Sequence, residues 1–281
     1  MMLNRTLSPT ESPFATQAVA IVVPVNNEER LLPSAIAGLH VAVSYARQVR
    51  PGLKVAVRFA LDRCTDASQT IIEAAGFRWI AARRPGVGAA RSAGVSAALA
   101  ELSAYPDHRV LVASTDADSV VPADWITHQV ELAEGGADVI VGAVKPRADD
   151  PDWERRTAWE LTHRDSQSLG HIHGANLGLR ANFYLAAGGF APLQEHEDVD
   201  LVARAARIGA RVRPTEVHCV ITSGRLEGRT AGGYAGYLRD ELLALAHASA
   251  TGQSATRPSA TGRTAADPSA SDRPVPQRSA A

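Results

Sequence analysis

The sequence has few cysteines, few lysines and no long apolar run, and each shortage excludes a class of protein. Its 281 residues include only Cys64 and Cys219, too few for a disulfide framework, which fits a reducing compartment. The 29 basic and 30 acidic residues give a formal net charge of −1, and no basic stripe of a nucleic-acid-binding protein is present. The apolar stretch 18–25 is too short to cross a bilayer. We therefore expect a cytoplasmic protein with no transmembrane segment.

Composition divides the chain into three parts. Residues 1–17 are polar and contain proline, so we expect a flexible segment and not a signal peptide. From about residue 248 onward Ser, Thr, Ala, Gly, Pro and Arg dominate, and we expect 248–281 to be a disordered tail. The region between them, 18–247, is long enough for a single folded domain.

Apolar runs alternate with amphipathic stretches in the first half of this domain. We expect strands at 18–24, 53–61, 77–82 and 109–114, and helices at 66–75 and 89–103. Another helix is expected after the first strand, because Leu32, Ile36, Leu39 and Val43 recur at helical spacing. Strands that are apolar along their length are typical of a parallel sheet covered by helices on both faces. The expected fold is therefore a single Rossmann-like α/β domain.

The second half has a less regular pattern. We expect a strand at 138–145, an extended piece at 174–180 and one or two strands within 211–221. Helices are expected at 151–169, 197–208 and 233–246.

Polar clusters follow three of the expected strands, at 26–28, 62–66 and 116–118. Ligands of such sheets bind beyond the carboxyl ends of the strands. Asp116 and Asp118 are one residue apart, so both would face the same way from a strand. Their oxygens suit Mg²⁺ or Mn²⁺, which can also bind a diphosphate. The alternative is a simple turn or helix cap, a common use of aspartate after a strand.

These clusters, in this order, resemble the family 2 glycosyltransferases of the GT-A fold over roughly 18–239. The segments that carry the resemblance are 22–29 (VVPVNNEE), 60–66 (ALDRCTD), 86–94 (GVGAARSAG), 116–118 (DAD), 188–190 (GGF) and 197–201 (EDVDL). The resemblance implies a mixed, mostly parallel sheet, with a nucleotide-binding half at 18–120 and an acceptor-side half at 121–247. It implies a metal-dependent hexosyltransferase-like enzyme of EC class 2.4.

The resemblance also implies which residues bind the donor. They are Pro24, Asn26, Glu28, Asp62, Asp66, Arg91, Asp116, Gly174, Asn176 and Arg225. Arg91 is expected to pair with the diphosphate or with the metal-site carboxylates. Structural alternatives stay open: Asp66 as a helix cap, Glu28 in a first helical turn, Gly174 and Asn176 in a turn.

Metal binding and catalysis are assigned to a second set of residues. Asp116 and Asp118 are the expected metal ligands, and His218 is a candidate for the third. Asp198, assisted by Glu197, is the expected general base of an inverting transfer, because a carboxylate must take the proton of the acceptor hydroxyl. A place at a helix N-terminus is the alternative for both acids. Asp200 lies four residues before Arg204, the spacing of a surface ion pair.

Partners follow from the same comparison. The Gln-x-x-Arg-Trp pattern of processive synthases is missing, so we expect transfer of one sugar at a time. The expected donor is a UDP- or GDP-sugar. The sequence does not identify the acceptor; a lipid or a small glycan is expected, and a lipid would place the protein at the inner membrane surface. The sequence is compatible with a homodimer but does not determine the oligomeric state. No role is assigned to His171 or His173.

Two alternative functions remain. A nucleotidyltransferase would carry glycine and lysine in its first loop, which 24–28 lacks. The presence of Asp116, Asp118 and Asp198 weighs against a non-catalytic nucleotide-sugar-binding homologue.

Overall fold

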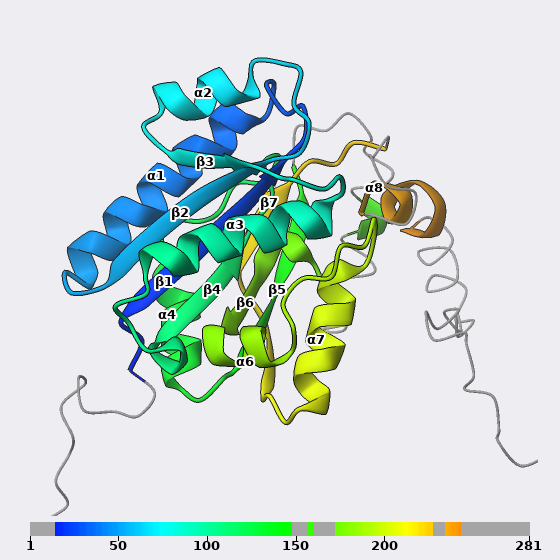
Figure 1. Ribbon diagram of the computed structural model, residues 1–281. Coiled ribbons are helices and arrows are strands. Elements are labelled where there is room, and N and C mark those ends of the chain that lie inside the picture. The colour runs from blue at the N-terminus through cyan, green and yellow to red at the C-terminus, as the bar shows by residue number, and fades with distance from the viewer. Residues whose placement is uncertain (1–14, 148–156, 160–171, 227–233, 243–281) are drawn as a thin grey trace, which may run out of the picture.

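The computed structural model describes residues 15–147, 157–159, 172–226 and 234–242 (Figure 1). In chain order its elements are β1 (Ala18–Val25), α1 (Leu32–Val49), β2 (Lys54–Leu61), α2 (Ser68–Ala74), β3 (Arg78–Ala81), α3 (Val87–Glu101), η1 (Asp107–Arg109), β4 (Val110–Ser114), α4 (Trp125–Glu134), β5 (Val139–Pro146), η3 (Gly174–Asn176), β6 (Leu177–Arg180), α6 (Ala181–Ala186), α7 (Glu197–Arg207), β7 (Val212–Thr222), α8 (Tyr234–Gly236) and the π-helical turn η4 (Tyr237–Glu241). None of the described helices is both long and apolar enough to cross a membrane.

Seven strands of the described chain form one sheet in the order β3-β2-β1-β4-β6-β5-β7. Strands β1 to β4 run parallel to one another, and β5 is parallel to β7. Only β6 is reversed, because it is antiparallel to both β4 and β5. Its first residue, Leu177, therefore lies beside Ser114 at the end of β4. The predicted mixed, mostly parallel sheet is confirmed.

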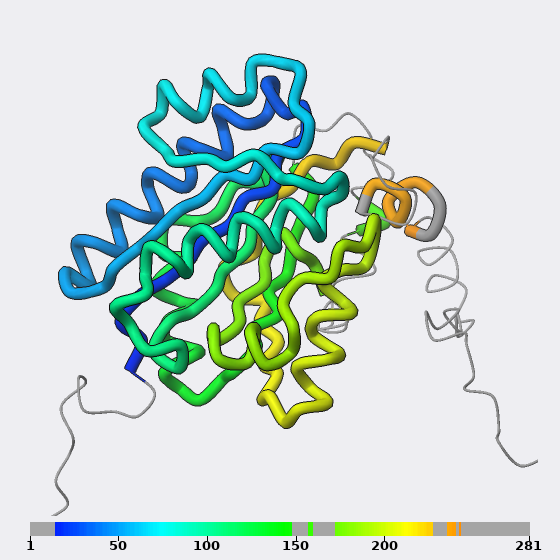
Figure 2. Tube along the Cα trace, in the orientation of Figure 1, coloured from blue at the N-terminus to red at the C-terminus, as the bar shows by residue number. Residues whose placement is uncertain are grey.

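Helices cover both faces of the sheet (Figures 1 and 2). One core layer lies between the sheet and α1, α2 and α4, and contains Ile21, Leu39 and Trp125. The other lies between the sheet and α3, α6 and α7, and contains Val22, Val95 and Leu201. Since alternate residues of β1 enter opposite layers, the period of two explains why the strand is apolar throughout.

Most predicted elements are confirmed, with ends that differ by one or two residues. The predicted stripe on α1 is buried, and the region 211–221 forms one strand, β7. Helices α4 and α6 were not predicted. In α4 the signal was present, because Ile126, Val130 and Ala133 recur at helical spacing before Gly135. The predicted helix at 151–169 lies mostly outside the described residues, as do 1–14 and 248–281.

Candidate active site

The loops after β1 and β2 meet at the carboxyl edge of the sheet. The Asn26 amide donates a hydrogen bond to the carbonyl oxygen of Asp62 (2.6 Å), and the Thr65 N–H donates to Asn27 Oδ1 (2.7 Å). Pro24, the last residue but one of β1, lies opposite Ala60 of β2. The predicted convergence of these loops is confirmed.

Asp62 joins this pair of loops to the start of α3. Its side chain is buried, Oδ2 accepts a hydrogen bond from the Gly86 N–H (2.9 Å) and Oδ1 accepts one from Arg63 Nε (3.0 Å). Gly86 has a φ of +108°, a conformation that favours glycine. Asp62 therefore fixes the turn that leads into the helix carrying Arg91.

Asp66 has the contacts of a helix cap. Its Oδ1 accepts a hydrogen bond from the Ser68 N–H (3.0 Å) at the start of α2, and Oδ2 accepts one from the Glu29 N–H (2.9 Å). Both oxygens are thus used by backbone donors, which favours the structural alternative for this residue.

Three charged side chains from distant segments meet beyond the end of β4. Arg225 Nη2 lies 2.8 Å from Glu28 Oε1 and 3.1 Å from Asp118 Oδ2. Backbone hydrogen bonds between Val120 and Ile221, with N···O distances of 2.7 and 3.0 Å, hold the end of β7 against the Asp118 loop. This bridge explains how Arg225, more than 100 residues along the chain, reaches the aspartate.

Asp118 is poorly compensated by protein charges. Burial and the neighbouring Asp116 raise the pKa of Asp118 to about 6, and Glu28 adds to the effect. Arg225 opposes it, as does a hydrogen bond from Ser119 Oγ (3.2 Å). A further positive charge near Asp118 would lower this pKa, as a bound cation does for its carboxylate ligands.

Arg91 lies buried between the two halves of the site. Its guanidinium forms ion pairs with Asp116 and with Glu197, the first residue of α7. The ring of Phe190 lies beneath it, 5.8 Å from the guanidinium carbon to the ring centroid. Of the two predicted pairings for Arg91, the one with a metal-site carboxylate is present in the structure.

Gly174 separates Arg91 from Asp198. A Cβ atom at Gly174 would overlap the Arg91 guanidinium, so a side chain there would displace the guanidinium from its present position. The Gly174 N–H donates a hydrogen bond to Asp198 Oδ2 (2.6 Å), and the Val199 N–H donates to Oδ1 (2.8 Å). The Asp198 carboxylate is therefore held in one orientation, only partly buried, beside the arginine that binds Asp116.

Three predicted site residues make contacts that the sequence did not predict. Glu197 was expected to assist the base, but its carboxylate is buried and paired with Arg91, so it positions that arginine. Asn176 was expected to contact the donor, but its buried amide accepts a hydrogen bond from Trp125 Nε1 (2.9 Å) and donates one to the Ala143 carbonyl (2.9 Å). His218 was expected at the metal, but its Nδ1 lies 2.9 Å from Asp124 Oδ1, and its ring lies tilted against that of His128 with the centroids 4.3 Å apart.

Two histidines keep an open role. His171 lies outside the described residues, and His173 directly precedes η3 with its carbonyl oxygen bonded to the Asn176 N–H (3.0 Å).

Sequence reasoning missed the residues that support these groups. Ser68 Oγ accepts a hydrogen bond from the Glu28 N–H (3.0 Å), and the hydroxyls of Ser119 and Thr222 are hydrogen-bonded to each other (2.8 Å). Phe190 had no predicted role beyond its place in a motif. No local pattern distinguishes such serines from surface ones, because their partners are 40 and 103 residues away.

The charges at the site favour a divalent cation. Four carboxylates (Glu28, Asp116, Asp118 and Glu197) are linked by two guanidiniums (Arg91 and Arg225), which leaves a net charge of −2. Among the described residues no three Cys, His, Asp or Glu side chains are grouped to hold a metal ion. A cation here would thus take carboxylate oxygens from Asp116 and Asp118 and complete its shell from water or phosphate, as Mg²⁺ commonly does.

Comparisons with known proteins agree with this geometry. The profile of a family described as glycosyl transferase family 2 matches residues 20–188, more than half of the chain. No curated protein gives a match.

Solved structures share the fold. Glucosyl-3-phosphoglycerate synthase from Mycobacterium tuberculosis, in complex with Mn²⁺, UDP and glucosyl-3-phosphoglycerate, is 17% identical with a TM-score of 0.54, covering 90% of this chain and 87% of that chain. The mannosyltransferase PcManGT from Pyrobaculum calidifontis, in complex with GDP-Man and Mn²⁺, is 16% identical with a TM-score of 0.55, covering 87% and 76%. The family match over most of the sheet, together with the aspartates at its carboxyl edge, shows that the chain belongs to glycosyl transferase family 2 and is a glycosyltransferase.

Proposed function

We propose that this glycosyltransferase moves one sugar from a nucleoside diphosphate donor to an acceptor hydroxyl, with a divalent cation and with inversion at the anomeric carbon. The observation that carries the proposal is the pair Asp116 and Asp118 at the end of β4, within a cluster of net charge −2. A buried carboxylate with a pKa near 6 is costly unless a cation binds beside it.

Asp116 and Asp118 would hold Mg²⁺ or Mn²⁺. Bound there, the ion would neutralise charge that develops on the leaving diphosphate. The two related structures bind Mn²⁺ with UDP or GDP-Man, so the fold accepts either base. We propose a UDP- or GDP-sugar as the donor.

Residues around the aspartates would bind the rest of the donor. Asn26, Glu28 and Asp62 surround the loop junction where a base and ribose would sit, beside Pro24. Arg225 can exchange a carboxylate for a phosphate oxygen, because its fork binds either anion. Asp66 would contribute to donor binding indirectly, because its carboxylate accepts backbone hydrogen bonds that hold the loop in place.

Asp198 would act as the general base. One carboxylate oxygen takes the proton of the acceptor hydroxyl while that oxygen forms a bond to the anomeric carbon. The bond from the anomeric carbon to the diphosphate breaks, and its electron pair leaves with the diphosphate. Each Asp198 oxygen has more than one lone pair, so the hydrogen bonds from Gly174 and Val199 leave room for the acceptor.

The acceptor is proposed to be a small glycan or a lipid, in the cytoplasm or at its membrane surface. A thermal-shift series with UDP-, GDP-, dTDP- and CDP-sugars, each with and without Mn²⁺, tests the donor proposal. The true donor should raise the melting temperature only with metal, since a ligand of the folded state stabilises it. An equal shift in Asp118→Asn would refute the metal site.

A further inference from the structure

The first half of β2 is an open edge of the sheet. Strand β1 pairs with β2 along all of Lys54–Leu61, whereas β3 pairs only with its second half, from Arg58 opposite Arg78 to Leu61 opposite Ala81. In the described chain no strand covers 54–57 on that side. The Val57 carbonyl oxygen accepts a hydrogen bond from Arg58 Nη1 (2.9 Å), so an extended segment would pair with the other backbone groups on this side of residues 54–57.

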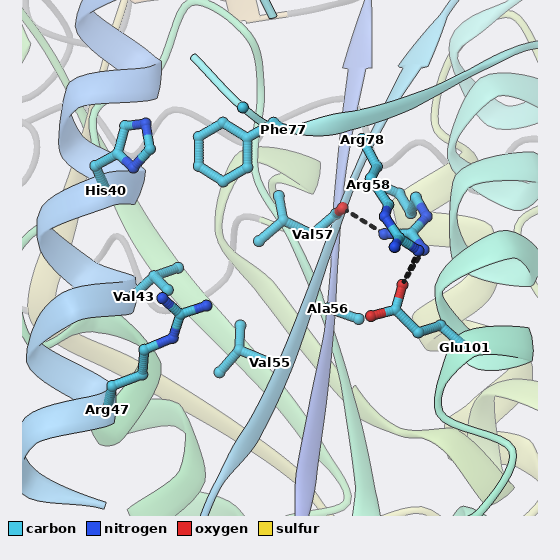
Figure 3. Close-up of a pocket in the computed structure, with 11 residues that line it drawn as sticks. His40, Val43, Arg47, Val55, Ala56, Val57, Arg58, Phe77, Arg78 and Glu101 are labelled. Atoms are coloured by element: carbon cyan, nitrogen blue, oxygen red, sulfur yellow. Dashed lines mark hydrogen bonds and ion pairs between the residues drawn. The ribbon is translucent and has the colours of Figure 1, made fainter. Parts of the chain in front are cut away.

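A cavity of about 260 Å³ opens along this edge. Figure 3 shows His40 and Arg47 of α1 on one side of β2, and Arg58, Arg78 and Glu101 on the other. The cavity lies at the start of β2, whereas Asp62 of the candidate active site follows the end of that strand. It is therefore separate from the donor site.

The lining is positively charged. Its three arginines outnumber its one carboxylate, Glu101, and these four side chains sum to a charge of +2. Arg58 and Arg78 both pair with the same oxygen of Glu101, Arg58 being buried. Arg47 forms no ion pair with any described residue, so its charge is available to a ligand.

We propose that this edge binds an acidic, extended peptide segment of a partner protein, which adds a strand beside residues 54–57 of β2. Successive side chains of a strand point to opposite faces. Acidic side chains of one segment can therefore reach Arg47 on one side and Arg78 on the other. A compact anion such as free phosphate would reach the arginines on one side only.

Two alternatives for the basic edge lead to different experimental outcomes. Charged side chains on an edge also prevent unwanted strand pairing. A second copy of this chain, related by a two-fold axis, would bring one positive cavity against another, which charge repulsion opposes.

The binding test uses a fluorescein-labelled octapeptide with glutamate at both odd and even positions. Its control has the same charge but a central proline, which cannot continue a strand ladder. We expect saturable anisotropy change with the first peptide and binding at least about tenfold weaker with the second. Equal binding of both peptides would mean charge attraction alone and would overturn the proposal, as would displacement of the peptide by equimolar inorganic phosphate.

Substitutions locate the site. Arg47→Gln and Arg78→Gln are each expected to weaken peptide binding about threefold, the order of an exposed ion pair. Arg207→Gln is the matched control, because Arg207 lies in the last turn of α7 as Arg47 does in α1. Unchanged affinity in both edge variants would overturn the proposal. Self-association of these variants without peptide binding would also overturn it, because the arginines would then serve to prevent strand pairing between molecules.

Hydrogen exchange tests strand addition directly. The peptide should slow amide exchange within 54–57, which charge pairing between side chains would not do. Slow exchange that is lost on dilution of the protein alone would show that a second copy covers the edge and would refute a peptide site.

Discussion

Arg225 Nη2 lies 3.1 Å from Oδ2 of Asp118, so an arginine compensates part of the charge where we propose a metal ion. The same nitrogen lies 2.8 Å from Glu28 Oε1. Without metal, this arginine is the nearest positive charge that both carboxylates share among the described residues.

Arg225→Ala should therefore destabilise the metal-free protein. Glu28 and Asp118 would keep their charges in a partly buried place without a partner, at a cost on the order of 1–3 kcal/mol. Added MnCl₂ should raise the melting temperature of this variant by more than it raises that of the wild type. Equal Mn²⁺ effects in the two proteins would contradict the shared role of Arg225 and the cation.

The raised pKa of Asp118 makes stability depend on pH. The folded state binds this proton more tightly than the unfolded state, where a carboxyl titrates near its ordinary value of 3.8. Metal-free stability should hence fall as pH rises from about 4 to about 6 and level off above that.

Asp118→Asn should remove this dependence. Above pH 6 the variant is expected to be more stable than the metal-free wild type by on the order of 1–3 kcal/mol, and to show no Mn²⁺ shift. Urea unfolding between pH 4 and pH 7 measures the difference. A wild type whose stability rises with pH through this window would show that the charged form of Asp118 is favoured instead.

Asp198→Asn should separate binding from turnover. The amide keeps the size of the carboxylate but cannot take a proton, so release of nucleoside diphosphate should fall about 10²- to 10⁴-fold. The donor-dependent thermal shift should persist. Asp200→Asn is the control, because Asp200 pairs with Arg204 at 2.7 Å and should leave turnover near wild type. Similar losses in both variants would argue against Asp198 as the base.

Arg91→Met should be strongly destabilising. Asp116 and the buried Glu197 would lose their shared partner, and breaking a buried pair costs about 3–5 kcal/mol. The double variant with Glu197→Leu should recover part of that loss. Urea denaturation of both single variants and the double variant measures the coupling, and simple additivity would show that the two side chains act independently.

Asn176→Ala tests the corrected role of that residue. The change leaves Trp125 Nε1 buried without an acceptor, which costs about 1–3 kcal/mol. The additional shift produced by donor and Mn²⁺ should stay the same size. A variant with normal stability but no donor shift would restore Asn176 to the donor site.

The sequence predicted those parts of the fold whose signals are local. The apolar run before Asp116 and the loop at 24–28 indicate strand ends, and parallel strands bring such ends to one edge. The motif order was enough to place Arg91 near Asp116, because both belong to the same half of the domain.

The contacts that the sequence did not predict join distant segments. His218 turns toward Asp124 because β7 bulges: Gly142 and Val144 of β5 pair with Thr215 and Val220, and His218 takes a φ of +62°. The sequence shows no sign of this irregularity in the strand. Glu197 is a comparable case, since its partner Arg91 is 106 residues earlier.

The reversed strand β6 has a consequence for how such enzymes diversify. Since β5 runs toward the edge with the aspartates and β6 starts there beside Ser114, the polypeptide between Pro146 and Gly174 leaves and rejoins the sheet at one side. Insertions, deletions or exchange in this part of the sequence would leave the ladder pairings of the described strands intact. The sequence between Pro146 and Gly174 can accordingly change, in evolution or by design, while Asp116 and Asp118 stay at the end of β4.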